Sequence, residues 1–228
     1  YIRTNIEGSY NILEASRKHK IKNIIITSTS EVYGTSQYNP MNELHPIVSQ
    51  SPYSASKTSA DNLAISYYRS FDLPVKIIRP FNTFGPRQSQ RAIIPTIVFQ
   101  ALKSKKIRLG NIKAIRDFTY VDDLIDAYIK LNDFNGLFGE IINIGTGRGI
   151  QIYEIVKYVE TILSKKISLS IDRSRIRPKN SEVYKLICDN SKAKKKLKWK
   201  PKISFEDGLS FFCEWASKQD LKKQISKI

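Results

Sequence analysis

Hydrophobic residues recur along the chain with two different periods, which predict helices and buried strands in alternation. Apolar positions three and four apart indicate one face of a helix, whereas short β-branched runs are typical of strands buried on both faces of a sheet. We expect helices at 4–18, 53–70, 94–103, 122–131 and 152–163, one that opens at 189–191, and a last one from Phe205. Strands are expected at 23–27, 75–80, near Ile107, at 141–144 and at 167–171. This alternation predicts a parallel α/β sheet.

Length and composition narrow the class of protein. A chain of 228 residues can bury one sizeable core, or one core with a small appended lobe. No apolar run approaches the roughly 20 residues that span a bilayer, and the first residues lack the features of a signal peptide. Cys188 and Cys213 lie far apart without a CxxC spacing, which argues against a metal site and a disulfide framework. We therefore expect a folded, cytoplasmic protein that does not enter a membrane.

The chain is strongly basic, with a formal net charge of +17. Such a charge raises the question of nucleic acid as a partner. The excess is spread along the chain, however, and concentrates only at 192–202, KAKKKLKWKPK. That run is typical of a solvated helix end, with a site for an acidic small molecule as the alternative. We do not expect nucleic acid to be the partner.

Three segments carry candidate chemistry: TSTSEVYG at 27–34, SPYSASK at 51–57 and RPFNTFGPRQ at 79–88. Tyr53 and Lys57 stand four residues apart on a predicted helix, so their side chains share one face. An ammonium near a phenol favours the phenolate and lowers the phenol's pKa, which makes Tyr53 a candidate proton acceptor. An isolated YxxxK is more often simple packing. The order of the three segments is what favours the chemical interpretation.

In that order the segments resemble those of the extended short-chain dehydrogenase/reductases that act on nucleotide sugars, the NAD-dependent epimerase/dehydratase family. RDFTYVDD at 116–123, INIGTG at 142–147 and CDNSKAKKKLKWKP at 188–201 resemble later landmarks of that family. The match is closest to 4,6-dehydratases acting on GDP- or UDP-linked N-acetylhexosamines, chiefly through RPKNSEV at 177–183. The alternatives left open within the family are a UDP-glucuronate decarboxylase and a nucleotide-sugar C4 epimerase.

The resemblance implies a fold and a division of the chain. Residues 1–148 would form part of a Rossmann-type, doubly wound parallel sheet, with a substrate-lobe insertion near 82–120. Residues 149–228 would form a small α/β substrate-binding lobe. The family's first strand and GxxGxxG turn, which hold the pyrophosphate of NAD, have no counterpart, since GTGRG at 145–149 follows a late strand. We therefore expect a fragment of an enzyme, and the alternative from another class is a non-catalytic domain or a basic binding module.

The resemblance also implies roles for individual residues. Thr29 would hydrogen-bond the sugar O4, Tyr53 would take its proton, and Lys57 would orient the nicotinamide ribose of NAD. Glu31 would remove the C5 proton and assist the loss of water from C6. Ser30 stands where dTDP-glucose dehydratases carry an aspartate, so Glu31 would have to serve as both base and acid. UDP-glucuronate decarboxylases share this Thr-Ser-Glu sequence.

Further residues are expected to bind the nucleotide-diphosphate sugar or to form an interface. Asn82 follows a strand, and Arg87, Arg116 and Arg177 can each offer a planar fork of donors to phosphate. Helices 4–18 and 53–70 carry more apolar surface than one sheet contact needs, including Tyr67, Tyr68 and Phe71. In the resembled family these two helices pair across a two-fold axis, which implies a homodimer. His45 and the two cysteines are interpreted as structural.

Overall fold

A three-stranded parallel sheet forms the centre of one part of the protein. The structure, a computed structural model, describes residues 1–176, 178 and 181–219. Strands β1 (Ile24–Thr27), β2 (Val75–Pro80) and β6 (Ile141–Ile144) lie in the order β1-β2-β6. Ile26 pairs with Ile77, and Ile77 pairs with Ile141. Isoleucines dominate these strands because both faces of the sheet are covered, which confirms the predicted parallel α/β architecture.

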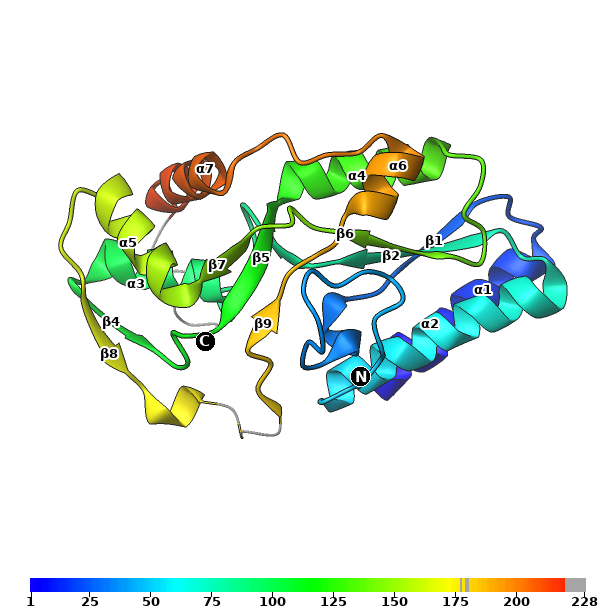
Figure 1. Cartoon of the computed structure of the whole chain (residues 1–228), viewed down its shortest axis with the longest axis horizontal. Helices are drawn as coiled ribbons and strands as arrows, with labels where there is room; N and C mark the ends of the chain where they lie inside the picture. Colours follow the sequence, from blue (N-terminus) through cyan, green and yellow to red (C-terminus); the bar gives the residue numbers. More distant parts are fainter. Residues whose placement is uncertain (177, 179–180, 220–228) are drawn as a thin grey trace.

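Helices cover both faces of this sheet (Figure 1). Below it in the view lie α1 (Gly8–Lys18), which continues the π-helical turn Ile2–Glu7, and the long α2 (Pro52–Phe71). Above it lie α4 (Val121–Asp133) and the short α6 (Ser191–Leu197). Two separate apolar clusters result, one joining Leu13 and Ala64 to the sheet and the other joining Leu131 and Trp199 to it. The sheet is therefore doubly wound.

A second α/β part lies beside the first (Figure 1). It contains α3 (Ile93–Lys103), α5 (Ile152–Ile162) and α7 (Phe205–Ser217), with β4 (Lys106–Leu109) paired in parallel with β8 (Ser168–Ile171). Its core is the largest apolar cluster of the described residues and runs from Phe84 to Ala216. The predicted boundary at 148/149 stays a prediction, and residues on both sides of it, from Phe84 to Tyr120 and from Ile150 to Ala216, contribute to this core. Residues Ala193, Leu197 and Trp199, however, return to the first sheet.

A small mixed sheet joins the two parts, and the hydrophobic pattern did not predict it. It consists of β3 (Asn82–Phe84), β5 (Ile115–Tyr120), β7 (Gly149–Gln151) and β9 (Lys185–Leu186). Three of these strands have only two or three residues, too few for a period to be visible. The fourth, β5, carries Arg116 and Asp117 in its middle, which interrupt any apolar run.

Local signals explain why α2 begins and ends where it does. Ser51 accepts a hydrogen bond from the backbone N–H of Ser54, whose hydroxyl accepts one from the N–H of Ser51, and Pro52 fits the first helical position. The helix ends at Asp72, which adopts a left-handed conformation. The predicted helix at 53–70 is thus confirmed to within one residue at each end.

The apolar surface of the two paired helices differs from the expectation. Tyr67 is buried between α1 and α2, and its hydroxyl donates to Glu14 at 3.0 Å. The large apolar side chains that α1 and α2 do expose are Tyr10, Ile12 and Phe71. Tyr67 therefore belongs to the apolar core that α1 and α2 form with the sheet.

In the part of the chain that the structure describes, no helix is both long and apolar enough to cross a bilayer.

Candidate active site

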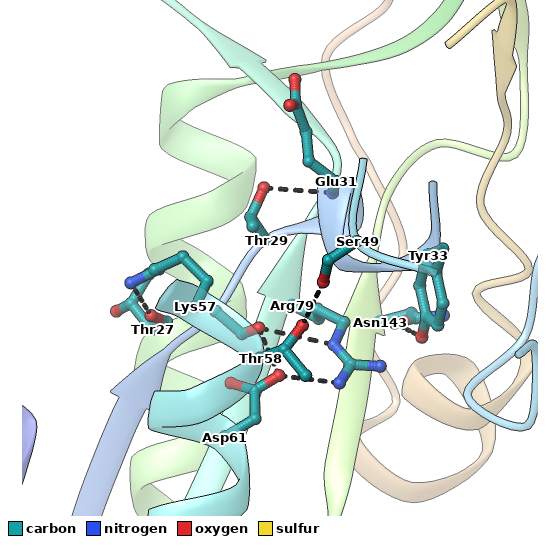
Figure 2. Close-up of polar contacts among 11 residues, drawn as sticks. Thr27, Thr29, Glu31, Tyr33, Ser49, Lys57, Thr58, Asp61, Arg79 and Asn143 are labelled. Carbon is teal, nitrogen blue, oxygen red and sulfur yellow. Dashed lines mark hydrogen bonds and ion pairs between the residues drawn. The ribbon is translucent and has the colours of Figure 1, made fainter. Parts of the chain in front are cut away.

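The candidate site begins where strand β1 ends. A short 3-10 helix, η2 (Ser30–Tyr33), follows the strand, and Thr29 caps its N-terminus by accepting a hydrogen bond from the backbone N–H of Glu31 at 3.3 Å. Glu31 points away from the strand on the same side as Thr29 (Figure 2). A polar pair is thereby presented at the carboxyl end of a parallel strand, where ligands of α/β proteins bind.

Tyr53 lies in the first turn of α2 and reaches this pair. Its side chain is half-buried and lies close enough to that of Thr29 to interact with it. Burial raises the pKa of Tyr53, the Thr29 contact lowers it, and the negative charge of Glu31 raises it. The sequence-based argument expected a lowered pKa, but in this structure the pKa of Tyr53 is above its ordinary value because burial outweighs the effect of Thr29. Thr29, Glu31 and Tyr53 lie close together, and the roles predicted for them stay predictions.

Lys57 stands one helical turn after Tyr53 and turns toward the strand. Its ammonium donates to the carbonyl of Thr27 at 2.6 Å. Burial lowers the pKa of Lys57, and the nearby carboxylate of Asp61 raises it. The ammonium therefore sits at the carboxyl edge of β1, with a hydrogen bond to the backbone of that strand.

A cavity of about 780 Å³ opens beside Glu31 and extends into the second part of the protein, whereas Thr29, Tyr53 and Lys57 do not line it. Glu31, Asn82 and Arg116 line it, so three predicted site residues share one space. The side-chain oxygens Oδ1 of Asn82 and Oε1 of Gln88, another lining residue, are buried without a hydrogen-bond partner. Orphaned polar atoms at the wall of a cavity are suited to a polar ligand, since burying them unpaired is costly.

The arginines differ in their placement. Arg116 reaches the cavity from β5, and its guanidinium also donates to the carbonyls of Ile115 and Val183. Arg87 is exposed, adopts a left-handed backbone conformation with φ of 66°, and does not line the cavity. Arg177 lies outside the described residues, so its predicted role is not addressed by the structure.

Sequence reasoning missed several residues that line the cavity. Gln88 directly follows Arg87 in the motif RPFNTFGPRQ, Arg175 stands two residues before the segment RPKNSEV at 177–183, and Glu182 lies within it, so proximity to the motifs was a usable signal. Arg91 stands just before α3 and carried no such signal. His45 and the two cysteines are buried and do not line the cavity, and the His45 ring accepts a hydrogen bond from the backbone N–H of Gln37 at 3.0 Å.

Comparisons of the sequence and the fold with known proteins identify the family of the chain. The sequence matches the family described as GDP-mannose 4,6 dehydratase over residues 1–211. UDP-glucuronate 4-epimerase from Thermodesulfobacterium geofontis is 32% identical over 225 residues, covering 97% of this chain and 67% of that protein. UDP-glucuronic acid decarboxylase 1 from Arabidopsis thaliana is 32% identical over 218 residues, covering 91% of this chain and 48% of that protein.

A solved structure also shows similarity to nucleotide-sugar enzymes. The crystal structure of dTDP-glucose 4,6-dehydratase from Bacillus anthracis in complex with NAD superposes with a TM-score of 0.88 at 32% identity, covering 95% of this chain and 68% of that one. The chain thus spans about two thirds of the length of the epimerase and the dehydratase. An epimerase, a decarboxylase and a dehydratase are equally similar, so identity alone does not select one reaction. The chain belongs to the GDP-mannose 4,6 dehydratase family, within the NAD-dependent nucleotide-sugar dehydratases and epimerases of the short-chain dehydrogenase/reductase group.

Proposed function

We propose that the protein is an NAD-dependent nucleotide-sugar 4,6-dehydratase, which oxidises the sugar at C4, eliminates water across C5 and C6, and returns hydride to C6. The observation that carries the proposal is the position of Glu31. Its carboxylate lines the cavity and lies close enough to Tyr53 to raise the pKa of that phenol. A ketone at C4 acidifies the C5 hydrogen, and a carboxylate beside the oxidation site can remove it. Simple C4 epimerisation has no need of such a base.

The chain's own residues would divide the work as follows. Thr29 hydrogen-bonds the sugar O4, and Tyr53, whose side chain lies beside that of Thr29, accepts the proton from O4. Lys57 presents an ammonium at the end of β1, which suits the hydroxyls of a nicotinamide ribose and fits NAD as the cofactor. Bound NAD would accept hydride from C4 and later supply it to C6. Glu31 takes the C5 proton and, in the absence of a second acid at Ser30, delivers it to the leaving C6 hydroxyl, which departs as water. C5 regains a proton from solvent when hydride returns to C6.

The substrate proposed is a nucleotide-diphosphate sugar with GDP or UDP and an N-acetylhexosamine. Asn82 and Arg116 line the cavity together with Arg91 and Arg175, which supplies guanidinium groups for a diphosphate. The predicted roles of Arg87 and Arg177 stay predictions, since the first lies outside the cavity lining and the second outside the described residues.

The test uses protein produced from its complete reading frame, incubated with UDP- and GDP-N-acetylhexosamines. We expect a 4-keto-6-deoxy product, identified by NMR and by the mass of one lost water. Glu31→Gln is expected to retain C4 oxidation, seen as NADH absorbance, while water loss slows about 100-fold or more. Glu214→Gln, at an exposed ion pair with Lys218, is the matched control and should leave both steps unchanged.

Other outcomes assign other functions. Release of carbon dioxide from a UDP-glucuronate substrate would make the protein a decarboxylase, and inversion at C4 without loss of water would make it an epimerase. A protein that neither binds NAD in a titration nor turns over any of these sugars would support the non-catalytic domain. Salt-sensitive RNA binding would support the basic binding module.

We also propose that the protein forms a homodimer through α1 and α2, the helices that expose Tyr10, Ile12 and Phe71. Ile12→Glu is expected to give monomers in light scattering, because a dimer would bury an unpaired carboxylate at that position. Ile129→Glu is the matched control, since Ile129 is equally exposed, at 56% against 57% for Ile12, but lies on α4 over the opposite face of the sheet. A dimer mass that persists in folded Ile12→Glu would contradict this interface.

A further inference from the structure

We propose that the buried ion pair between Asp61 and Arg79 is a positioning element of the active site, which holds in place the segment that carries Thr29 and Glu31. The proposal rests on the proposed function, because it assigns these two residues a purpose in the same reaction. Neither residue lines the cavity, so neither is a catalytic residue. Their effect would be exerted through the backbone and through Ser28.

The pair is part of a compact hydrogen-bonded group. Nη2 of Arg79 donates to Oδ2 of Asp61 at 2.7 Å, and the hydroxyl of Ser28 donates to the same oxygen at 2.7 Å. Nε of Arg79 also contacts the Ser28 hydroxyl at 3.4 Å. Figure 2 shows Asp61 and Arg79 pointing toward one another below Thr29. Arg79 and Asp61 are 0% and 1% exposed, so bulk water does not screen this interaction.

The group links three elements that build the site. Asp61 lies on α2, one helical turn beyond Lys57 and two beyond Tyr53. Arg79 lies at the end of β2, and Ser28 directly precedes Thr29. The helix that carries the proposed proton acceptor is thereby fastened to the strand end that carries its hydrogen-bond partner.

Arg79 also holds the far end of the same segment. Its guanidinium carbon lies 4.7 Å from the ring centre of Tyr33, the last residue of η2. The Tyr33 hydroxyl in turn donates to Oδ1 of Asn143 on β6 at 2.8 Å. Residues 28–33 are therefore held at both ends by one arginine, with Thr29 and Glu31 between the two contacts.

Stability alone does not account for a charged pair at this position. A buried ion pair often contributes no more than apolar side chains of similar volume, because both charges lose their hydration. Here Oδ1 of Asp61 and Nη1 of Arg79 even lack a hydrogen-bond partner. What an apolar pair could not reproduce is the directed contact to Ser28 and the stacking on Tyr33.

The experiment compares wild-type protein with the double variant Asp61→Asn/Arg79→Met, which removes both charges and keeps similar volumes. We expect the double variant to fold with a melting temperature near that of the wild type. Hydrogen exchange of the backbone amides in 28–33 should become about tenfold faster. The rate of C4 oxidation, followed by NADH absorbance, should fall about 100-fold with little change in KM, because a displacement of about 1 Å is costly to the chemical step whereas the cavity residues are untouched.

Two further variants separate positioning from folding. Arg79→Lys keeps the charge and should recover part of the lost rate. Asp123→Asn alters another buried aspartate, which accepts hydrogen bonds from the backbone of Lys202 and Ile203, and should lower the melting temperature without changing exchange at 28–33. Unchanged exchange and unchanged kcat in a folded double variant, or in Asp61→Asn alone if the double variant does not fold, would overturn the proposal. Because exchange is measured without substrate, it tests the ion pair even if the protein proves not to be a dehydratase.

Discussion

Replacing Tyr53 with phenylalanine is expected to lower kcat about 1000-fold while leaving the affinity for the nucleotide sugar nearly unchanged, because it removes the proposed proton acceptor for O4. The ring and its packing are retained, and the cavity residues Asn82 and Arg116 are not altered. The loss should therefore appear in single-turnover formation of NADH, whereas calorimetric binding of the sugar nucleotide should match the wild type. Tyr184→Phe, on an exposed tyrosine, is the control. A Tyr53→Phe rate within tenfold of the wild type would place the proton acceptor elsewhere.

The pH dependence of this step follows from the surroundings of Tyr53. Only the phenolate can accept the proton, and burial together with the charge of Glu31 raises the pKa of Tyr53. The rate of C4 oxidation should therefore increase with pH up to the pKa of the tyrosine in the working complex. Glu31→Gln removes a negative charge that raises this pKa, so the rise should move to lower pH in that variant. The two substitutions thus report on the electrostatic interaction between Tyr53 and Glu31 from its two partners.

The first sheet and its helices could be predicted because the sequence of each element follows one regular pattern of apolar and polar residues. The run Asn23 to Thr27 has no polar interruption, as a strand buried on both faces requires, and α2 starts at a serine and proline that fit the first turn of a helix. Lys76 and Arg79 are exceptions within β2. Their charges are satisfied by groups far away in the sequence, the carbonyls of Leu131 and Phe134 for Lys76 and the carboxylate of Asp61 for Arg79.

The candidate site was predictable where it depends on local spacing and not where it depends on packing between segments. Tyr53 and Lys57 share a helix face by their spacing alone. Gln88 lines the cavity, whereas Arg87 does not. This difference depends on the left-handed backbone conformation of Arg87, which turns its side chain outward. The direction of Lys57 toward Thr27 likewise depends on where β1 ends relative to α2. Neither relation is encoded within a single motif.

Asp117 shows most clearly how a motif residue can serve the fold rather than the chemistry. It lies in the middle of β5 and is completely buried. One carboxylate oxygen accepts hydrogen bonds from the backbone N–H of Thr146 at 2.8 Å and from its hydroxyl at 2.6 Å. The other accepts from the backbone N–H groups of Gly147 at 2.8 Å and Cys188 at 3.1 Å. Asp117 thereby joins β5 to the loop after β6 and to the segment that leads into α6.

Asp117→Asn is accordingly expected to lower the free energy of unfolding by about 3 kcal/mol, since the amide group would face backbone N–H donors that need an acceptor. In a domain of this size that corresponds to a melting temperature about 10 °C lower, measured by circular dichroism or calorimetry. Asp126→Asn makes the same chemical change in a partly exposed ion pair with Lys202 and should cost less than about 0.5 kcal/mol. Equal melting temperatures for the two variants would show that the four contacts of Asp117 do not stabilise the junction between the sheets.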